Sequence, residues 1–223
     1  MKRFILSILF TSTLSFAQEK PVPNVPVIFF EYARLYDNIV CPNAFDPAWS
    51  QEATELEPHF KEVWEKESPL FWSTLFSKFP YGFSRKEYTG TLSVCSKSPS
   101  YSNPLVFNIT RLLKSFVKEK PLWEDYKFAD LVFHEMIHNW LMENFVYQTP
   151  LMEKYKNENS GVKNHFHLMG IQAWVYSKLE RKDLSEWIDF RYQQMPPDYQ
   201  RAWQIVKEEG FEKVINDLIP KHP

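Results

Sequence analysis

Residues 131–140 read LVFHEMIHNW, and this stretch guides the interpretation of the rest of the chain. His134 and His138 are four residues apart, so a helix would place both imidazoles on one face, about one turn apart. That spacing lets two histidines reach one zinc ion. Glu135, next to the first histidine, could then act as general base on the water at such a site. The pattern therefore predicts a helix that carries one zinc ion per chain.

The residues around the motif favour a buried helix. From Leu131 to Leu141, Glu135 is the only formally charged residue, and there is no proline. A buried carboxylate beside two buried imidazoles is costly unless a cation compensates it. The competing interpretation is an ordinary buried helix whose two histidines are satisfied by hydrogen bonds.

A catalytic zinc ion requires a third protein ligand. The pattern HExxHxxGxxH is excluded because Leu141 and Asn144 occupy the glycine and third histidine positions. A glutamate on a later helix is the second option, with Glu153, Glu158 and Glu180 as candidates. The first two lie in a polar stretch, 153–161, that is typical of an exposed loop, and Glu180 lies among basic residues at an expected helix end.

His165 and His167 are the better candidates for the third ligand. They follow His138 by 27 and 29 residues and begin a new apolar helix after Ser160-Gly161, which is expected to form a turn. On that helix His165 lies about 60° from the centre of the expected buried face, and His167 about 100° away. We therefore predict His134, His138 and His165 as metal ligands, with His167 as the alternative third ligand. Two surface histidines at a helix start are the competing interpretation.

The order of predicted elements indicates an α+β fold, helix-rich, with a small mixed sheet that precedes the metal helix. Two to four strands and at least three helices after the metal helix are expected. The expected helices are 47–67, a second one that starts at Ser68-Pro69, and later ones over 166–179, 184–194, 199–209 and 211–218. The expected strands are 88–95 and 105–109, separated by a loop over 99–104.

The N-terminus is typical of a signal peptide over residues 1–17. Lys2 and Arg3 precede an apolar stretch of about 13 residues that ends at Ala17, and this stretch is too short to span a bilayer comfortably. The pattern predicts an exported protein, periplasmic or secreted, with one domain over residues 18–223 and no stable membrane anchor. An uncleaved N-terminal anchor is the alternative.

The net charge bears on the possible partners of the protein, and the cysteine content bears on whether it contains a disulfide. The net charge is −2, or −4 without the two N-terminal cations, and no basic stripe is present, so a nucleic-acid partner is not expected. Cys41 and Cys95 are the two cysteines. In an exported protein they favour one disulfide, which would close a loop of about 55 residues and stabilise the fold by about 3–4 kcal/mol in the chain-entropy model. Two free thiols are the alternative.

In residues 131–140 and the later histidine pair, the chain resembles the zincin metallopeptidases. The resemblance implies a zincin-like fold that hydrolyses a peptide or protein substrate, with Glu135 as general base. It also implies that strand 105–109 is an edge strand to which an extended substrate could pair. The candidates for the donor to the oxyanion are Tyr147, Tyr155, Tyr176 and His167. Two other functions stay open: a non-catalytic metal-binding or interaction protein, and a zinc amidase that acts on a cell-wall amide.

Overall fold

The computed structural model describes residues 23–42, 46–117 and 124–221. The predicted signal peptide, 1–17, lies outside the described residues. The strands are β1 (Val27–Tyr32), β2 (Glu87–Ser93), β3 (Tyr101–Ser102) and β4 (Leu105–Asn108). The helices are α1 (Arg34–Val40), α2 (Pro47–Lys78), α3 (Asp125–Asn144), α4 (Pro150–Lys154), α5 (Ser160–Lys178), α6 (Lys182–Gln194), α7 (Pro197–Glu209) and α8 (Phe211–Asn216), with a 3₁₀ turn at Thr110–Leu112.

The sheet is small and mixed, as the sequence predicts, with the strand order β1-β2-β4-β3. Strands β1, β2 and β4 are parallel, and β3 pairs antiparallel to β4. Burial alternates along β1, where Ile28 and Phe30 are buried and Val27 and Phe29 are exposed. One face of the sheet is therefore covered, and the ring of Phe128 on α3 lies 5.4 Å from that of Phe30.

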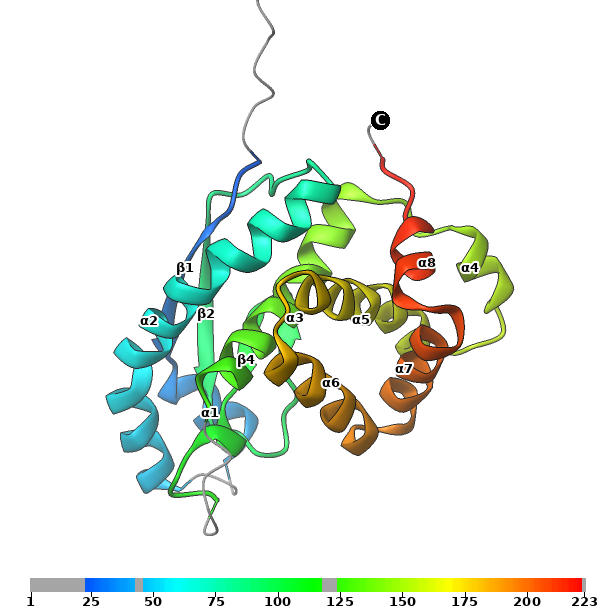
Figure 1. Cartoon of the computed structure of the whole chain (residues 1–223). Helices are drawn as coiled ribbons and strands as arrows, with labels where there is room; N and C mark the ends of the chain where they lie inside the picture. The colour runs from blue at the N-terminus through cyan, green and yellow to red at the C-terminus, as the bar shows by residue number, and fades with distance from the viewer. Residues whose placement is uncertain (1–22, 43–45, 118–123, 222–223) are drawn as a thin grey trace, which may run out of the picture.

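Helix α3, which carries the HEMIH motif, occupies the middle of the molecule. Figure 1 shows α2 and the sheet on one side of α3 and helices α5 to α8 on the other. Its residues from Val132 to Ile137 are all buried, so the predicted buried helix is confirmed. Helix α5 packs closely against α8, because a Cβ added at Gly170 would lie only 2.6 Å from Val214 Cγ1. This packing fixes the position of α5 relative to the C-terminal helices.

The predicted break at Ser68-Pro69 is wrong. Helix α2 continues through Pro69 as one 32-residue helix. An internal proline costs about 3 kcal/mol through a lost hydrogen bond and a clash. The residues that follow pack deep in the core: the rings of Phe71 and Trp72 lie 4.9 and 5.1 Å from that of Phe133 on α3. Burial of these aromatic rings offsets the local cost, and a local sequence pattern cannot show it.

The position of strand β4 differs from the expectation that it is an edge strand. The predicted strand 105–109 is present as β4, Leu105–Asn108, but it lies between β2 and β3, so both of its sides are paired and it is not an edge strand. The edge on this side of the sheet is β3, within the stretch predicted as a loop. Asn139 Nδ2 on α3 donates a hydrogen bond of 2.9 Å to the Ser102 carbonyl of this strand. The edge strand is therefore held against the HEMIH helix.

The start of α5 differs from the predicted turn. Ser160 and Gly161 are its first two residues, because the side chain of Asn159 accepts a hydrogen bond from Val162 N at 3.0 Å and caps the helix. The polar stretch before it is also partly helical, since α4 extends to Lys154. The later predicted helices are present as α6, α7 and α8, with ends shifted by about two residues, the usual scatter of helix boundaries. No helix in the described part of the chain is long and apolar enough to cross a membrane.

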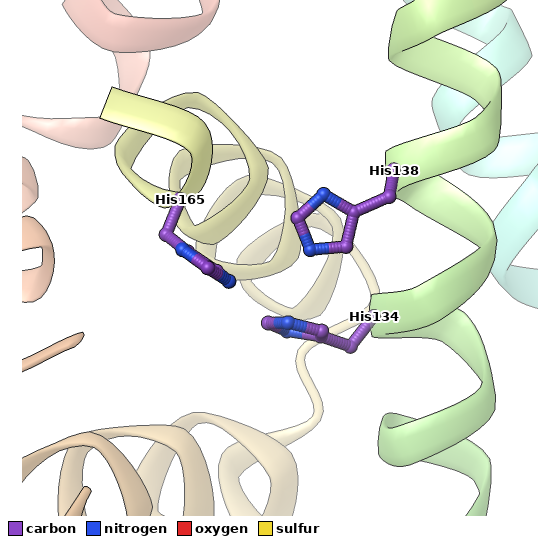
Figure 2. A group of neighbouring side chains, drawn as sticks. All are labelled: His134, His138 and His165. Atoms are coloured by element: carbon purple, nitrogen blue, oxygen red, sulfur yellow. The ribbon is translucent and has the colours of Figure 1, made fainter. Parts of the chain in front are cut away.

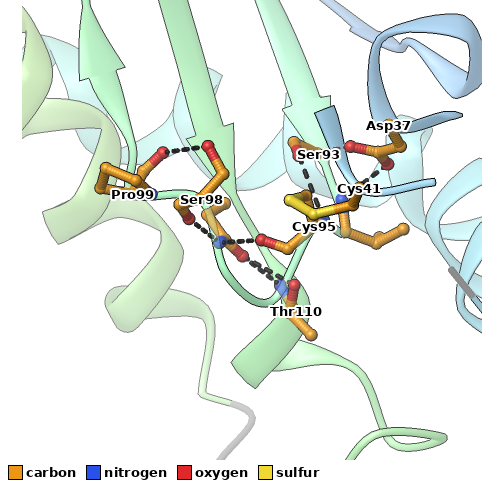
Figure 3. Close-up of a disulfide and its surroundings, with 9 residues drawn as sticks. Asp37, Cys41, Ser93, Cys95, Ser98, Pro99 and Thr110 are labelled. Carbon is orange, nitrogen blue, oxygen red and sulfur yellow. Dashed lines mark hydrogen bonds between the residues drawn. A yellow bond between two sulfur atoms is a disulfide. The ribbon is translucent and has the colours of Figure 1, made fainter. Parts of the chain in front are cut away.

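The expected disulfide between Cys41 and Cys95 is present, with the two Cα atoms 5.7 Å apart. It joins the end of α1 to the segment after β2 (Figure 3). The buried carboxylate of Asp37 on α1 accepts hydrogen bonds from Ser93 Oγ at 2.5 Å and from Val94 N at 2.9 Å. Covalent and polar contacts thus attach α1 to the sheet.

Candidate metal centre

Three histidines from two helices meet in one place. His134 and His138 come from α3, and His165 comes from the second turn of α5. One nitrogen of each ring lies within 4.8 Å of the others, and Figure 2 shows the three rings turned toward a common space. These are the three residues that the sequence analysis names as ligands, and their binding of a metal stays a prediction. In the described part of the chain no other group of three potential ligand side chains is this compact.

Hydrogen bonds orient two of the three rings. His165 Nδ1 lies 2.6 Å from the Gly161 carbonyl oxygen, which can only accept, so Nδ1 carries the proton. His134 Nδ1 lies 3.0 Å from the Tyr192 hydroxyl and 3.2 Å from Gln172 Oε1. The Tyr192 hydroxyl donates to Gln172, so its oxygen accepts from His134 Nδ1. In both neutral rings Nε2 is therefore the unprotonated nitrogen, the form that a metal ion requires.

Burial keeps the three rings neutral. It lowers the pKa of His134 well below its usual value, with the positive charge of Arg191 as the next contribution. It lowers the pKa of His138 to about 3, and that of His165 also falls. Metal binding to a protonated imidazole would first have to displace a proton, so three neutral rings at neutral pH suit a cation.

A second layer of polar groups supports His134. Gln172 Nε2 donates to Asp130 Oδ1 at 2.6 Å, so the amide links His134 to a fully buried carboxylate. Asp130 forms an ion pair with Arg191, whose Nη1 lies 2.5 Å from Oδ2. The same carboxylate also accepts hydrogen bonds from Tyr176 and Trp187. A ligating histidine is commonly oriented by such outer partners.

Glu135 is buried beside the histidines, with 6% of its surface exposed. Within the described residues no hydrogen bond or ion pair to its carboxyl group is found, and burial raises its pKa to about 8. A buried carboxyl without a partner is costly. Its place next to three neutral imidazoles fits a site that holds a cation, because a cation would stabilise the carboxylate.

Tyr199, near the start of α7, is a site residue that the sequence analysis missed. Its ring centroid lies 4.2 Å from that of His165, and Glu135 is near enough to influence its pKa, which is raised chiefly by burial and then by that carboxyl. Its hydroxyl forms no hydrogen bond with the residues that the structure describes. Tyr199 follows His138 by 61 residues and belongs to a different helix, so no local motif could have indicated it.

The other predicted oxyanion donors are engaged or lie apart from the three histidines. Tyr176 donates to Asp130 at 2.8 Å and Tyr155 donates to Glu209 at 2.6 Å. Tyr147 donates to Asn164 at 3.2 Å. His167 Nε2 lies 2.9 Å from Asp217 Oδ2, so this nitrogen is already engaged by a carboxylate.

The three glutamates considered as ligands do not join the histidine group. Glu153 forms an ion pair with Lys156 at 2.7 Å and Glu158 with Arg201 at 2.8 Å. Glu180 follows the end of α5 with a positive φ of 55° and is not among the clustered ligand atoms. Of these candidate ligands, the structure therefore brings together His134, His138 and His165 and none of the three glutamates.

Comparison with known proteins gives no relative for this site. No family model matches the chain, and no curated protein or solved structure matches it significantly.

Proposed function

We propose that the protein is an exported, zinc-dependent hydrolase of the zincin type that cleaves peptide bonds. The observation that supports this most is the cluster of three histidines, whose ligand nitrogens lie within 4.8 Å of one another, with the buried Glu135 beside them. His134, His138 and His165 would hold the ion, and a set of three protein ligands is typical of catalytic rather than structural zinc sites. Zinc when bound would supply Lewis-acid activation of water and of the scissile carbonyl.

The residues of the chain have separate tasks in this proposal. Glu135 accepts a proton from the attacking water and passes it to the leaving amine, as a general base and then a general acid. Tyr199, whose hydroxyl has no hydrogen bond in the described structure, donates to the oxygen of the tetrahedral intermediate. The pair of Gln172 and Tyr192 holds His134 in the tautomer that the metal requires.

Replacement of Glu135 tests the hydrolytic mechanism. The Glu135→Gln variant should bind zinc as the wild type does but lose at least about 10²-fold in kcat, because the amide cannot accept the proton. Cleavage of a mixed peptide library is followed by mass spectrometry, with a crosslinked cell-wall peptide as a separate substrate. Glu65→Gln, on the exposed surface of α2, is the matched control and should keep full activity.

Three results would count against parts of this proposal. Near-full activity of Glu135→Gln would reject Glu135 as the base. A zinc-loaded wild type that cleaves neither substrate would favour a non-catalytic metal-binding protein. Cleavage of the cell-wall peptide alone would make the enzyme an amidase of a different substrate class.

A further inference from the structure

A cavity of about 400 Å³ opens beside the metal centre. His138 is a member of the histidine group and also lines this cavity, so the two spaces adjoin. The volume of the cavity lies within the range of small-ligand sites. Its walls are mainly apolar and are formed by Leu141, Met142, Phe145, Val146, Met152 and Leu218.

Two lysines give this cavity a positive charge. Lys163, in the first turn of α5, and Lys221, near the C-terminus, both line it, and none of the described residues that line it is acidic. Neither lysine forms an ion pair with a residue that the structure describes. Their ammonium groups contact only backbone oxygens there: Lys163 Nζ lies 3.4 Å from the Lys156 carbonyl, and Lys221 donates to the Met142 carbonyl.

Among the residues that the structure describes, the neighbouring surface does not supply a free carboxylate to pair with these two lysines. A hollow next to the cavity shares Tyr147, Met152 and Lys163 with it and contains one acidic side chain, Glu153. That carboxylate is already paired with Lys156. Asp217, behind His167, accepts from His167, Thr149 and Leu151. Each lysine thus keeps unused N–H donors, and both residues line the cavity.

We propose that this cavity binds the part of the substrate next to the scissile bond, and that it selects an apolar stem that carries a carboxylate. The inference rests on the proposed function. Lys163 and Lys221 would hold the carboxylate, and the apolar walls would cover the stem. The carboxylate could be the free C-terminus of a peptide or an acidic side chain, since both present the same group.

Matched pairs of labelled hexapeptides distinguish the two sources. The first pair is Ala-Ala-Phe-Leu-Ala-Leu as free acid and as C-terminal amide. The second pair has blocked ends and differs only by an internal Glu or Gln. Binding is measured by fluorescence anisotropy on the zinc-loaded Glu135→Gln protein, which removes turnover from the measurement, and kcat/KM is measured on the wild type.

The lysines are replaced by methionine, which keeps the apolar stem, singly and together. The Lys163→Met/Lys221→Met protein should bind the carboxylate peptides about tenfold more weakly, with less than a twofold change for the amide or Gln partners. Arginine at both positions should restore the preference. Lys61→Met, an exposed lysine on α2, is the control and should change nothing. Salt should reduce the preference, because the lysines are accessible to solvent.

The outcomes separate this inference from the proposed function. Equal binding of acid and neutral partners by the wild type, or an equal loss of both in the double variant, would overturn the carboxylate site. Cleavage without a carboxylate preference would leave the hydrolase intact and reject the cavity assignment. A lysine-dependent carboxylate preference in a protein that cleaves nothing would support the cavity and reject the hydrolase.

Discussion

His165 and His167 lie two residues apart on α5, but they face different surroundings. On one side of the helix, His165 donates from Nδ1 to the Gly161 carbonyl of its own helix, and this leaves Nε2 for the space shared with α3. On the other side, His167 Nε2 binds Asp217 at 2.9 Å. His165 is therefore available to a metal ion, because its hydrogen bond uses Nδ1 and leaves Nε2 free. In His167 it is Nε2 that makes the hydrogen bond.

The Asp217 side of α5 has the features of a structural contact. Burial acts to raise the pKa of Asp217, but hydrogen bonds from His167 and Thr149 outweigh it, so the pKa lies below its usual value. The carboxylate also accepts from Leu151 N at 3.1 Å. Asp217 thus joins α5 to the start of α4 and the end of α8. His167 on this side contributes to the fold and also lines the cavity beside His138, whereas His165 belongs to the histidine group itself.

The largest expected difference between the two sides is in zinc affinity. His165→Ala should weaken zinc binding by more than about 100-fold, because loss of a direct ligand costs more than the 10- to 100-fold typical of an outer partner. Competition with a chelator measures the affinity, and His167→Ala is the matched control. Equal losses, or a larger loss for His167→Ala, would reverse the ligand assignment.

A smaller loss of zinc affinity is expected when a residue that orients His134 is replaced. Gln172→Ala removes the amide that links His134 to Asp130 and should weaken zinc binding about 10- to 100-fold. Gln193→Ala, an exposed glutamine on α6, should leave the affinity unchanged. The same chelator competition applies. An unchanged affinity in Gln172→Ala would show that Tyr192 alone orients the ring.

The smallest expected effect on zinc belongs to the Asp217 side. His167→Asn should leave zinc affinity within about twofold, since the ring is outside the site, but should destabilise the zinc-free protein by about 1–3 kcal/mol through a weakened buried hydrogen bond. Urea unfolding with chelator present measures this difference. A loss of zinc without a loss of stability would place His167 in the metal site and remove the distinction between the two sides.

The three candidate metal ligands can be predicted from the sequence, because helical periodicity shows which residues of one helix share a face. The spacing of His134 and His138 and the angular position of His165 on its helix are local properties, and the structure brings these three rings together. The α+β class and the small mixed sheet can also be predicted, because each helix or strand has a local sequence pattern of its own.

Apart from the Cys41–Cys95 disulfide and the approach of His165 to the HEMIH helix, contacts between distant segments cannot be predicted from this sequence. The break expected at Pro69 is absent because burial of Phe71 and Trp72 outweighs a local preference. Tyr199 reaches the site only because α7 packs on α5. The cavity joins Lys163 to Lys221, 58 residues later in the chain. Such residues share no spacing rule, so only the packed structure shows them together.

The position of zinc in crystals of protein purified without added metal tests the central claim most directly. Anomalous diffraction at the zinc edge should show one site per chain, bound by His134, His138 and His165 at about 2.0–2.1 Å from nitrogen, with a fourth position free of protein ligands. No zinc at this place after dialysis against zinc, or a zinc ion bound by His167 instead of His165, would contradict the account.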